Sequence, residues 1–178
     1  FELARKCGFD NINTDLIAGL PTDTPESFKN SLDSIVRLNA ECITVHTLCM
    51  KRASRLTTEG VTLDLQQARD AREMLAYTQN ILGQNEYIPY YMYRQSRMVG
   101  NLENVGWSKK GFESLYNVYV MDETHTILAC GSGGVTKLKR NNPDYLERIF
   151  NFKYPYEYID RFDELIQRKS GIMQFYGQ

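Results

Sequence analysis

The fold is decided by the stretch Asp15-Leu16-Ile17-Ala18-Gly19-Leu20-Pro21-Thr22-Asp23-Thr24-Pro25-Glu26-Ser27. Residues 11–18 alternate and are rich in β-formers, which predicts a strand. Gly19-Leu20-Pro21 ends that strand, and Thr24-Pro25 is typical of a helix N-cap followed by proline at the first helical position. Because strand interiors disfavour aspartate, Asp15 needs a reason to stand where it does.

The stretch predicts a β-α-β unit. A helix is expected to run to about Leu38, because its apolar positions recur with a period near 3.6. The next run, residues 42–48, is apolar and β-branched, so a second strand follows parallel to the first. Ligands bind beyond the carboxyl ends of such strands, and Asp15 lies near that end. Spacing alone leaves two readings of Asp15 open: a ligand-binding group, or a turn cap that pairs with a nearby arginine.

Composition narrows the class of protein. The 178 residues are 42% hydrophobic, enough for a packed core, and the net charge of −1 gives no overall field that would favour nucleic acid. No apolar run is long enough to span a membrane and no signal peptide opens the chain, so a cytoplasmic location is expected. The chain begins at Phe1 without methionine, and residues 1–6 read as the end of a helix closed by Gly8. We therefore expect a piece of a longer protein.

The four cysteines fit neither a zinc ribbon nor an iron–sulfur ligand run. Three of them lie in or beside predicted strands, and buried free thiols are expected for all four. The set is Cys7, Cys42, Cys49 and Cys130.

The remaining chain predicts further elements with turn signals between them. They are a helix from Asp64 stopped by Gly83, a strand over 87–93 limited by Pro89 to a strand start or an edge, an irregular stretch over 94–111, a hairpin of Leu115–Met121 and Thr126–Cys130, a short helix opening at Asn142-Pro143, and a terminal helix over Pro155–Lys169 stopped by Gly171. A long irregular stretch is more often a functional loop than filler.

Other candidates for chemistry are few. Gly131–Gly134 forms either an anion-binding nest or a flexible turn. Cations cluster in residues 51–55, 94–110 and 137–140, and their convergence would suit a ligand with several carboxylates or phosphates. His46 and His125 are expected to be packed or solvent-facing, and no Ser-His-Asp or Cys-His arrangement can be argued from them.

Taken together, the motifs resemble one family. Asn13-Thr14-Asp15-Leu16-Ile17-Ala18-Gly19-Leu20-Pro21 and Thr24-Pro25-Glu26-Ser27-Phe28 are similar to the later barrel strands of the oxygen-independent coproporphyrinogen III oxidases, which are radical S-adenosylmethionine enzymes. The resemblance is narrowed to the HemZ-type coproporphyrinogen dehydrogenases by motifs in the C-terminal part: Tyr90–Gln95, Asn101–Gly106, Ser114–Asn117, Thr126–Ala129 with Gly131–Gly134, and Arg148–Lys153 followed by Pro155–Ile159.

The resemblance implies an α/β fold: residues 1–55 as the last two strands of an incomplete TIM-like barrel, and residues 56–178 as a mixed α+β C-terminal region. It implies S-adenosylmethionine and a [4Fe–4S] cluster as cofactors, although the family's Cys-x-x-x-Cys-x-x-Cys loop is absent and is expected upstream of Phe1. In the family the cofactor's radical drives oxidative decarboxylation of two propionates of coproporphyrinogen III, in haem biosynthesis, and the protein positions the reactants.

Carried over by motif, the resemblance assigns three cofactor contacts: Asp15 to the ribose hydroxyls, Cys49 through its backbone, and Val135 as a weaker contact. The resemblance assigns no catalytic residue and no metal ligand in this chain. The substrate, a tetracarboxylate porphyrinogen, needs cations to orient it, so Arg94, Arg97 and Lys137 are expected near it.

Two alternatives stay open: a haem-binding or haem-chaperone relative without oxidase activity, and an unrelated α/β-barrel lyase with a phosphate site at Gly131–Gly134. Expected partners are the porphyrinogen and an electron donor for the cluster, with no nucleic acid and no membrane. The chain alone is expected to be inactive, and its open sheet edge favours self-association.

Overall fold

The structure is a computed structural model that describes residues 1–50, 64–95, 98–141 and 144–177. The chain forms two compact units, Phe1–Leu115 and Tyr116–Gln178, which are described in turn.

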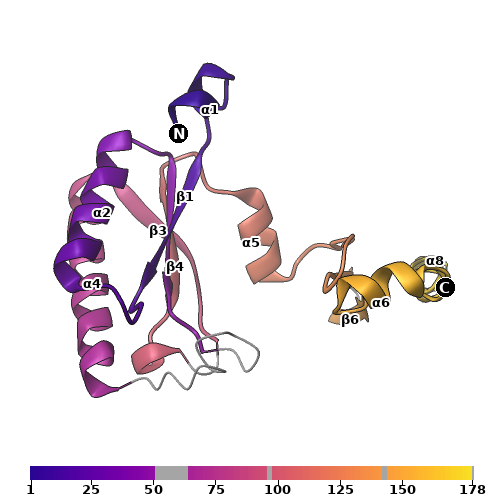
Figure 1. Cartoon of the computed structure of the whole chain (residues 1–178). Coiled ribbons are helices and arrows are strands. Elements are labelled where there is room, and N and C mark those ends of the chain that lie inside the picture. The colour runs from indigo at the N-terminus through magenta and orange to yellow at the C-terminus, as the bar shows by residue number, and fades with distance from the viewer. Residues whose placement is uncertain (51–63, 96–97, 142–143, 178) are drawn as a thin grey trace. The chain divides into compact units, whose positions relative to one another are not determined.

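The first unit is an open four-stranded sheet with two long helices (Figure 1). In chain order its elements are α1 (Glu2–Lys6), β1 (Asn13–Ala18), α2 (Pro25–Leu38), β2 (Cys42–Thr47), α4 (Leu65–Gln84), β3 (Tyr87–Tyr93), the 3-10 turn η1 (Val99–Asn101) and β4 (Asn104–Lys109). The strand order is β1-β2-β4-β3. β1 and β2 are parallel, whereas β4 pairs antiparallel with both β2 and β3.

The predicted β-α-β unit is confirmed. The Thr24 side chain accepts a hydrogen bond from the Ser27 amide at 3.2 Å, and Pro25 follows at the first helical position, so α2 begins where the sequence indicates. The helix ends at Asn39, which adopts a left-handed backbone conformation (φ 58°). β2 then returns beside β1 with Asp15 opposite Thr44.

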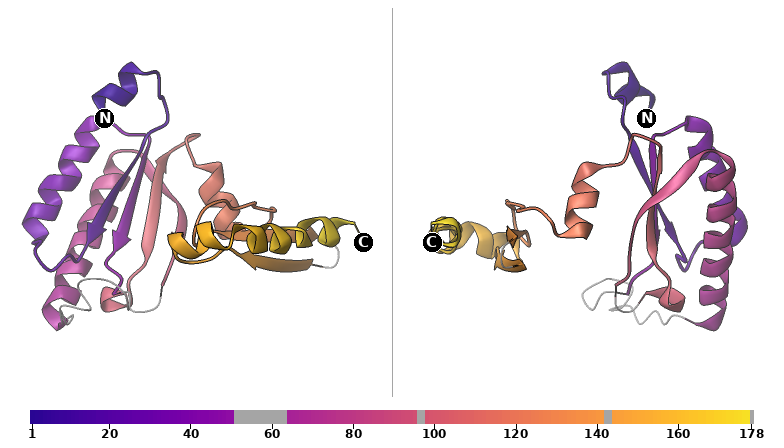
Figure 2. Two further views of the ribbon diagram at one scale, coloured as in Figure 1. Left: turned by 45° about the vertical axis from the view of Figure 1, so that its right-hand side comes forward. Right: turned by 180° about the vertical axis from the view of Figure 1, so that it is seen from behind.

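Helices α2 and α4 cover one face of this sheet, as both views of Figure 2 show. The strands alternate, so every second side chain faces the helices and forms the core. That core contains Ala18, Phe28, Leu32, Ile43, Val45, Met74, Leu82 and Trp107. Burial of this apolar surface holds α2 and α4 on the sheet.

Helix α4 begins as predicted, with Asp64 and Gln67 forming a capping box. The predicted stop at Gly83 is wrong, because the helix continues through it to Gln84. One glycine costs an otherwise well-packed helix only about 1 kcal/mol. β3 lies at the edge of the sheet, as Pro89 indicated.

The predicted irregular stretch over 94–111 is also wrong, since it contains η1 and the whole of β4. β4 is held by ladders on both sides, to β2 and to β3. These bonds are made between segments distant in the sequence, and the run around Gly106 has little β-propensity of its own.

The second unit contains an antiparallel hairpin and a run of short helices. Its elements are α5 (Leu115–Asp122), β5 (Val135–Asn141), β6 (Asp144–Phe150), α6 (Pro155–Asp160), α7 (Phe162–Lys169) and α8 (Gly171–Tyr176).

Several predictions for this unit are wrong. Leu115–Met121 is helical, not a strand, and in 126–130 the described pairing is a single bridge from Ile127 to Lys137. β6 stands where a short helix was expected after Asn142-Pro143, residues that themselves lie outside the described part. The predicted terminal helix is divided at Arg161 into α6 and α7, and Gly171, the predicted stop, is the first residue of α8. β-formers such as those of α5 follow their tertiary context more than their propensity.

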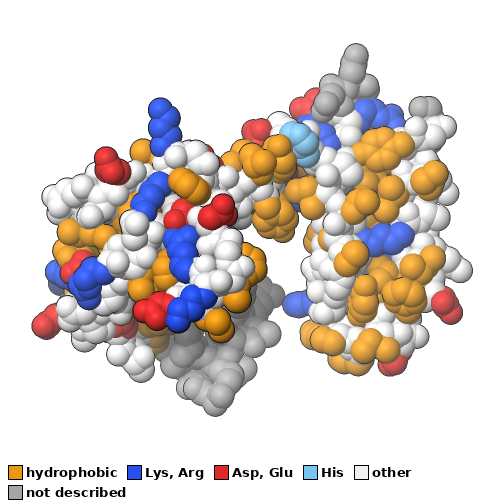
Figure 3. All heavy atoms as spheres, turned by 90° about the horizontal axis from the view of Figure 1, so that it is seen from above, with side chains coloured by type: hydrophobic (Ala, Val, Ile, Leu, Met, Phe, Trp, Pro, Cys, Tyr) orange, Lys and Arg blue, Asp and Glu red, His pale blue; other side chains and the backbone are white. Residues whose placement is uncertain are grey.

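The surface mixes apolar, acidic and basic side chains on the face seen in Figure 3, in keeping with a net charge near zero. Within the described ranges, no helix combines the length and apolarity needed to cross a bilayer. As predicted, no disulfide joins the four cysteines, all of which lie in the described ranges. Of the four, Cys42 is buried, Cys49 is half-buried, and Cys7 and Cys130 are exposed, so the expected burial is confirmed for Cys42 alone.

Candidate functional site

The face of the sheet turned away from α2 and α4 carries polar and aromatic side chains. We call it the polar face and define it by six residues: Asn13 and Asp15 of β1, Thr44 and His46 of β2, and Tyr91 and Tyr93 of β3. The alternation that turns Ile43 and Val45 into the core turns Thr44 and His46 to this face.

Asp15 is the acidic group of the polar face. Its side chain is 59% exposed, and its Oδ1 accepts a hydrogen bond from Asn13 Nδ2 at 2.6 Å. Its Oδ2 lies 3.8 Å from His46 Nε2 and accepts no hydrogen bond from the described residues. One carboxylate oxygen is therefore fixed and the other is available to a donor.

Asn13 is itself held in one orientation. Its Oδ1 is 3.1 Å from the Thr44 hydroxyl, which in turn lies 3.3 Å from the Tyr91 hydroxyl. Because Oδ1 accepts from Thr44, the amide nitrogen of Asn13 must point to Asp15. A chain of polar contacts thus runs from β3 across β2 to the carboxylate on β1.

His46 is the second titratable group here, and its Nδ1 lies 3.4 Å from the Tyr93 hydroxyl. Burial raises the pKa of Tyr93, a hydrogen bond with the Asn104 side chain lowers it, and the charges of Asp15 and Cys49 raise it again. Asp15 and Cys49, two of the predicted cofactor contacts, are therefore both close enough to act on the same tyrosine. Cys49 follows β2, and its backbone forms an isolated antiparallel β-bridge with Met98.

Gly106 of β4 positions the two tyrosines. A Cβ at this residue would lie 1.8 Å from the Tyr91 ring, so the ring lies directly against the glycine backbone. The Tyr91 and Tyr93 rings stack at 6.3 Å with an interplanar angle of 7°. This packing fixes the positions of the two β3 tyrosine rings on the polar face.

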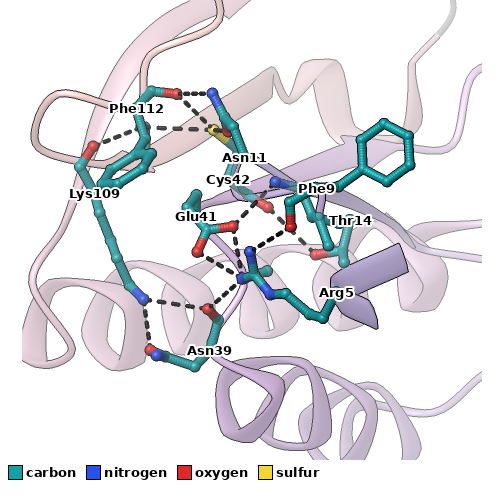
Figure 4. A network of polar contacts seen from close by, with 12 residues as sticks. Arg5, Phe9, Asn11, Thr14, Asn39, Glu41, Cys42, Lys109 and Phe112 are labelled. Carbon is teal, nitrogen blue, oxygen red and sulfur yellow. Dashed lines mark hydrogen bonds and ion pairs between the residues drawn. The ribbon is translucent and has the colours of Figure 1, made fainter. Parts of the chain in front are cut away.

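A second polar network lies at the amino end of β2 (Figure 4). Both oxygens of the buried Glu41 contact Arg5 Nη2, at 2.6 and 2.7 Å, and Glu41 Oε2 also accepts from the Ile12 amide at 3.0 Å. Burial raises the pKa of Glu41, but its hydrogen bonds to Arg5 and Ile12 and the Arg5 charge outweigh burial, so the net pKa is lowered. Each carboxylate oxygen of Glu41 therefore has at least one donor, and the network ties the N-terminal segment to the sheet.

The three cations expected near the substrate have different surroundings. Arg94 is exposed and forms an ion pair with Glu103. Lys137, in the second unit, donates to Glu123 Oε1 at 2.7 Å and to the Val120 carbonyl at 3.2 Å. Arg97, like the cations of residues 51–55, lies outside the described residues. Neither described cation is free for a ligand without giving up a partner.

Val135 begins β5 and, together with Lys137, lines a pocket of about 380 Å³ within the second unit. Tyr116, Val120, Ile127 and Leu128 form much of its wall. The pocket therefore brings together Val135, a predicted cofactor contact, and Lys137, a predicted substrate contact.

The glycine run is a closed turn. The amide of Gly131 donates to the Tyr158 hydroxyl, that of Gly133 to the Phe152 carbonyl and that of Gly134 to the Gly131 carbonyl, at 3.2, 2.7 and 3.3 Å. An anion-binding nest needs such amides to be free. The turn is therefore a structural element, and it offers little to the phosphate-loop alternative.

Beyond the ends of β1 and β2, a hollow of about 1150 Å³ lies between the start of α4 and η1. Its wall includes Arg69, Arg72, Met98 and Asn101. Across the residues that the structure describes, no cluster of three or more His, Cys, Asp or Glu side chains is arranged to hold a metal.

Sequence reasoning missed most of the polar face. It assigned His46 a packed or solvent-facing place, whereas the side chain lies between Asp15 and Tyr93. Asn13 could have been found, because residues two apart on a strand share a face. Tyr91, Tyr93 and Thr44 could not, because the register between strands brings them together.

Known proteins similar to this chain give a consistent picture. No protein-family model matches. The chain is 37% identical over 174 residues to the oxygen-independent coproporphyrinogen-III oxidase-like protein HemZ of Bacillus subtilis, covering 98% of this chain and 35% of that protein. The haem chaperone HemW of Lactococcus lactis is 29% identical over 150 residues, 79% of this chain and 35% of that protein. HemW of Bacillus subtilis is 39% identical over 51 residues, 29% of this chain and 14% of that protein.

Among solved structures, coproporphyrinogen III oxidase (HemN) from Escherichia coli, described as a radical SAM enzyme, superposes with a TM-score of 0.60 at 18% identity. The match covers 92% of this chain and 36% of that one. The likeness in structure confirms the α/β fold. The chain spans about a third of the length of HemZ and of HemN.

Proposed function

We propose that this chain, which is related over nearly its whole length to the oxygen-independent coproporphyrinogen-III oxidase-like proteins, forms the part of a radical S-adenosylmethionine enzyme that holds the cofactor's ribose. The observation that carries the proposal is Asp15, exposed on the polar face, whose Oδ2 accepts no hydrogen bond among the described residues and faces His46 Nε2 at 3.8 Å. A carboxylate oxygen in that state can accept a hydrogen bond from a sugar hydroxyl.

The described residues fit S-adenosylmethionine better than they fit an iron–sulfur cluster. Asp15 supplies an acceptor, and Cys49 follows β2 with its backbone in a β-bridge to Met98. Among the described residues, no group of cysteines has the arrangement of cluster ligands. With its cluster, S-adenosylmethionine supplies a radical that removes hydrogen from the substrate. The residues of this chain bind and orient.

For the substrate we propose a tetracarboxylate porphyrinogen, with two of its propionates decarboxylated. Arg94, Arg97 and Lys137 stay predicted contacts. Arg69 and Arg72 join them, because both are exposed in the hollow beyond the ends of β1 and β2, where α/β proteins bind ligands. An Arg69→Met/Arg72→Met double variant is expected to raise the KM for coproporphyrinogen III; an unchanged KM would remove both residues from the proposal.

Binding of S-adenosylmethionine tests the central assignment. In the full-length protein, Asp15→Asn keeps the shape of the side chain but removes its charge and one acceptor oxygen. We expect its Kd for S-adenosylmethionine, measured by isothermal titration calorimetry, to rise at least tenfold. Lys29→Met, at an exposed ion pair on α2, is the control and should bind as the wild type does.

A second candidate is a haem-binding chaperone, because the two HemW proteins are also similar to this chain. The two functions differ in their product. Conversion of coproporphyrinogen III to protoporphyrinogen IX by the reconstituted full-length protein supports the oxidase. Stoichiometric haem binding without that conversion would support the chaperone.

A further inference from the structure

Polar groups on two sides of Tyr93 lead towards His46. The Thr47 amide donates to Asn104 Oδ1 at 2.7 Å, and a backbone N–H can only donate, so this bond orients the Asn104 amide group. Asn104 lies directly opposite Tyr93 in the β3–β4 ladder, so its side chain and that of Tyr93 are neighbours on the sheet.

The Tyr93 hydroxyl lies 3.4 Å from His46 Nδ1, where it can donate its proton to the ring. A neutral imidazole that accepts at Nδ1 carries its proton on Nε2. With Tyr93 as the donor, the N–H of His46 would be at Nε2, the atom that lies 3.8 Å from Asp15 Oδ2.

The gap between these two atoms has a specific size. At 3.8 Å it is too long for a direct hydrogen bond, yet one hydroxyl oxygen can lie about 2.8 Å from both atoms. Such a hydroxyl would accept from His46 and donate to Asp15. On its other side, Asp15 is locked by Asn13 at 2.6 Å, so the carboxylate cannot turn its free oxygen away cheaply.

We propose that His46 is a second ligand-binding residue, which together with Asp15 Oδ2 binds a single sugar hydroxyl. The inference rests on the proposed function for the identity of the sugar, the ribose of an S-adenosyl compound. Asp15 accepts the hydroxyl proton, His46 donates to the hydroxyl oxygen, and Tyr93 is a positioning residue that holds the imidazole in the required tautomer. The other titratable group of the polar face is Tyr91 of β3, whose pKa burial raises and whose hydroxyl contacts Thr44.

Calorimetry with ligands that lack one hydroxyl tests the pair in the full-length protein. The probes are S-adenosylhomocysteine and its 2′-deoxy and 3′-deoxy analogues. We expect His46→Phe to raise the Kd for S-adenosylhomocysteine about tenfold and to leave the Kd unchanged for the one deoxy analogue that lacks the contacted hydroxyl. His46→Gln, which can place an N–H at the same site, should recover part of the affinity. Tyr93→Phe should weaken binding by less than His46→Phe does.

The outcomes separate the two proposals. If Asp15→Asn weakens binding and His46→Phe does not, the inference about His46 fails and the proposed function stands. If neither substitution changes the Kd, the proposed ribose site itself fails. A ligand-free check uses ¹⁵N NMR of the imidazole, assigned by its loss in His46→Gln: a proton on Nε2 supports the chain of donors, and a proton on Nδ1 overturns it.

Discussion

Glu41 and Asp15 are carboxylates of the same sheet with opposite surroundings. Glu41 is 8% exposed, and its oxygens are occupied by Arg5 and the Ile12 amide. The Asp15 side chain is 59% exposed, with one oxygen held by Asn13 and the other facing His46 across a gap. Both lie beside β2, so strand position alone does not explain the difference.

The comparison separates a carboxylate that stabilises the fold from one that is kept available. A buried charge persists only when its hydrogen bonds are complete, as those of Glu41 are. An exposed carboxylate pinned at one oxygen contributes little to stability, yet it is pre-oriented for a ligand. The predictions below test this division.

The largest expected effect is the loss of Glu41. Glu41→Ala leaves the Arg5 guanidinium and the Ile12 amide without their acceptor, so the free energy of unfolding should fall by about 3 kcal/mol. Urea unfolding followed by circular dichroism measures it. Asp15→Ala is the matched control and should change the same quantity by no more than about 0.5 kcal/mol. Equal losses in the two variants would contradict the division.

The same network should weaken in acid. The pKa of Glu41 is lowered below its ordinary value of 4.5 in the folded protein, so its contribution to stability is complete above the unfolded-state pKa and is lost as the pH falls through the folded-state value. We expect the difference in unfolding free energy between wild type and Glu41→Gln to shrink from about pH 5 down to about pH 3. A difference that stays constant over this range would mean that Glu41 does not titrate as proposed.

Gly106 tests the rigidity of the polar face. Gly106→Ala places a methyl group where the Tyr91 ring lies, so the ring must move away from Thr44, at a cost of about 1 to 2 kcal/mol. In a Tyr91→Ala background the added methyl meets no ring, and the cost should nearly vanish. A double-mutant cycle by urea unfolding should give a coupling of about 1 kcal/mol. Additive effects would show that the ring does not depend on the glycine.

The sequence predicted the β-α-β unit well because its signals are local. The Thr24-Pro25 cap, the period of the α2 core residues and the β-branched run of β2 each act within a few residues. β4 and α5 were missed for the opposite reason. β4 exists because β2 and β3 flank it, and the strand-like Leu115–Asp122 segment is helical.

The residues of the candidate site show the same contrast between local signals and contacts across strands. Asp15 was found because an aspartate in a strand is unusual, and a resemblance gave it a role. His46 looked ordinary, because its importance depends on Tyr93 from a strand 47 residues away. Likewise, a count of cations could not show that Lys137 is already paired with Glu123. Local chemistry can be read from the chain, whereas partners across strands require the register.

The smallest expected change in stability belongs to Asn13, and it sharpens the comparison most. Asn13→Ala removes the donor that pins Asp15 Oδ1 and the acceptor of the Thr44 hydroxyl, which keeps Tyr91 as a partner, so the free energy of unfolding should fall by less than about 1 kcal/mol. The carboxylate is then free to rotate, and the Kd for S-adenosylhomocysteine in the full-length protein should rise about threefold to tenfold. Ser34→Ala, an exposed position of α2, is the control for both measurements. Unchanged affinity in Asn13→Ala, beside weakened affinity in Asp15→Asn, would mean that Asp15 binds its ligand without being held in advance, and the contrast with Glu41 would then reduce to exposure alone.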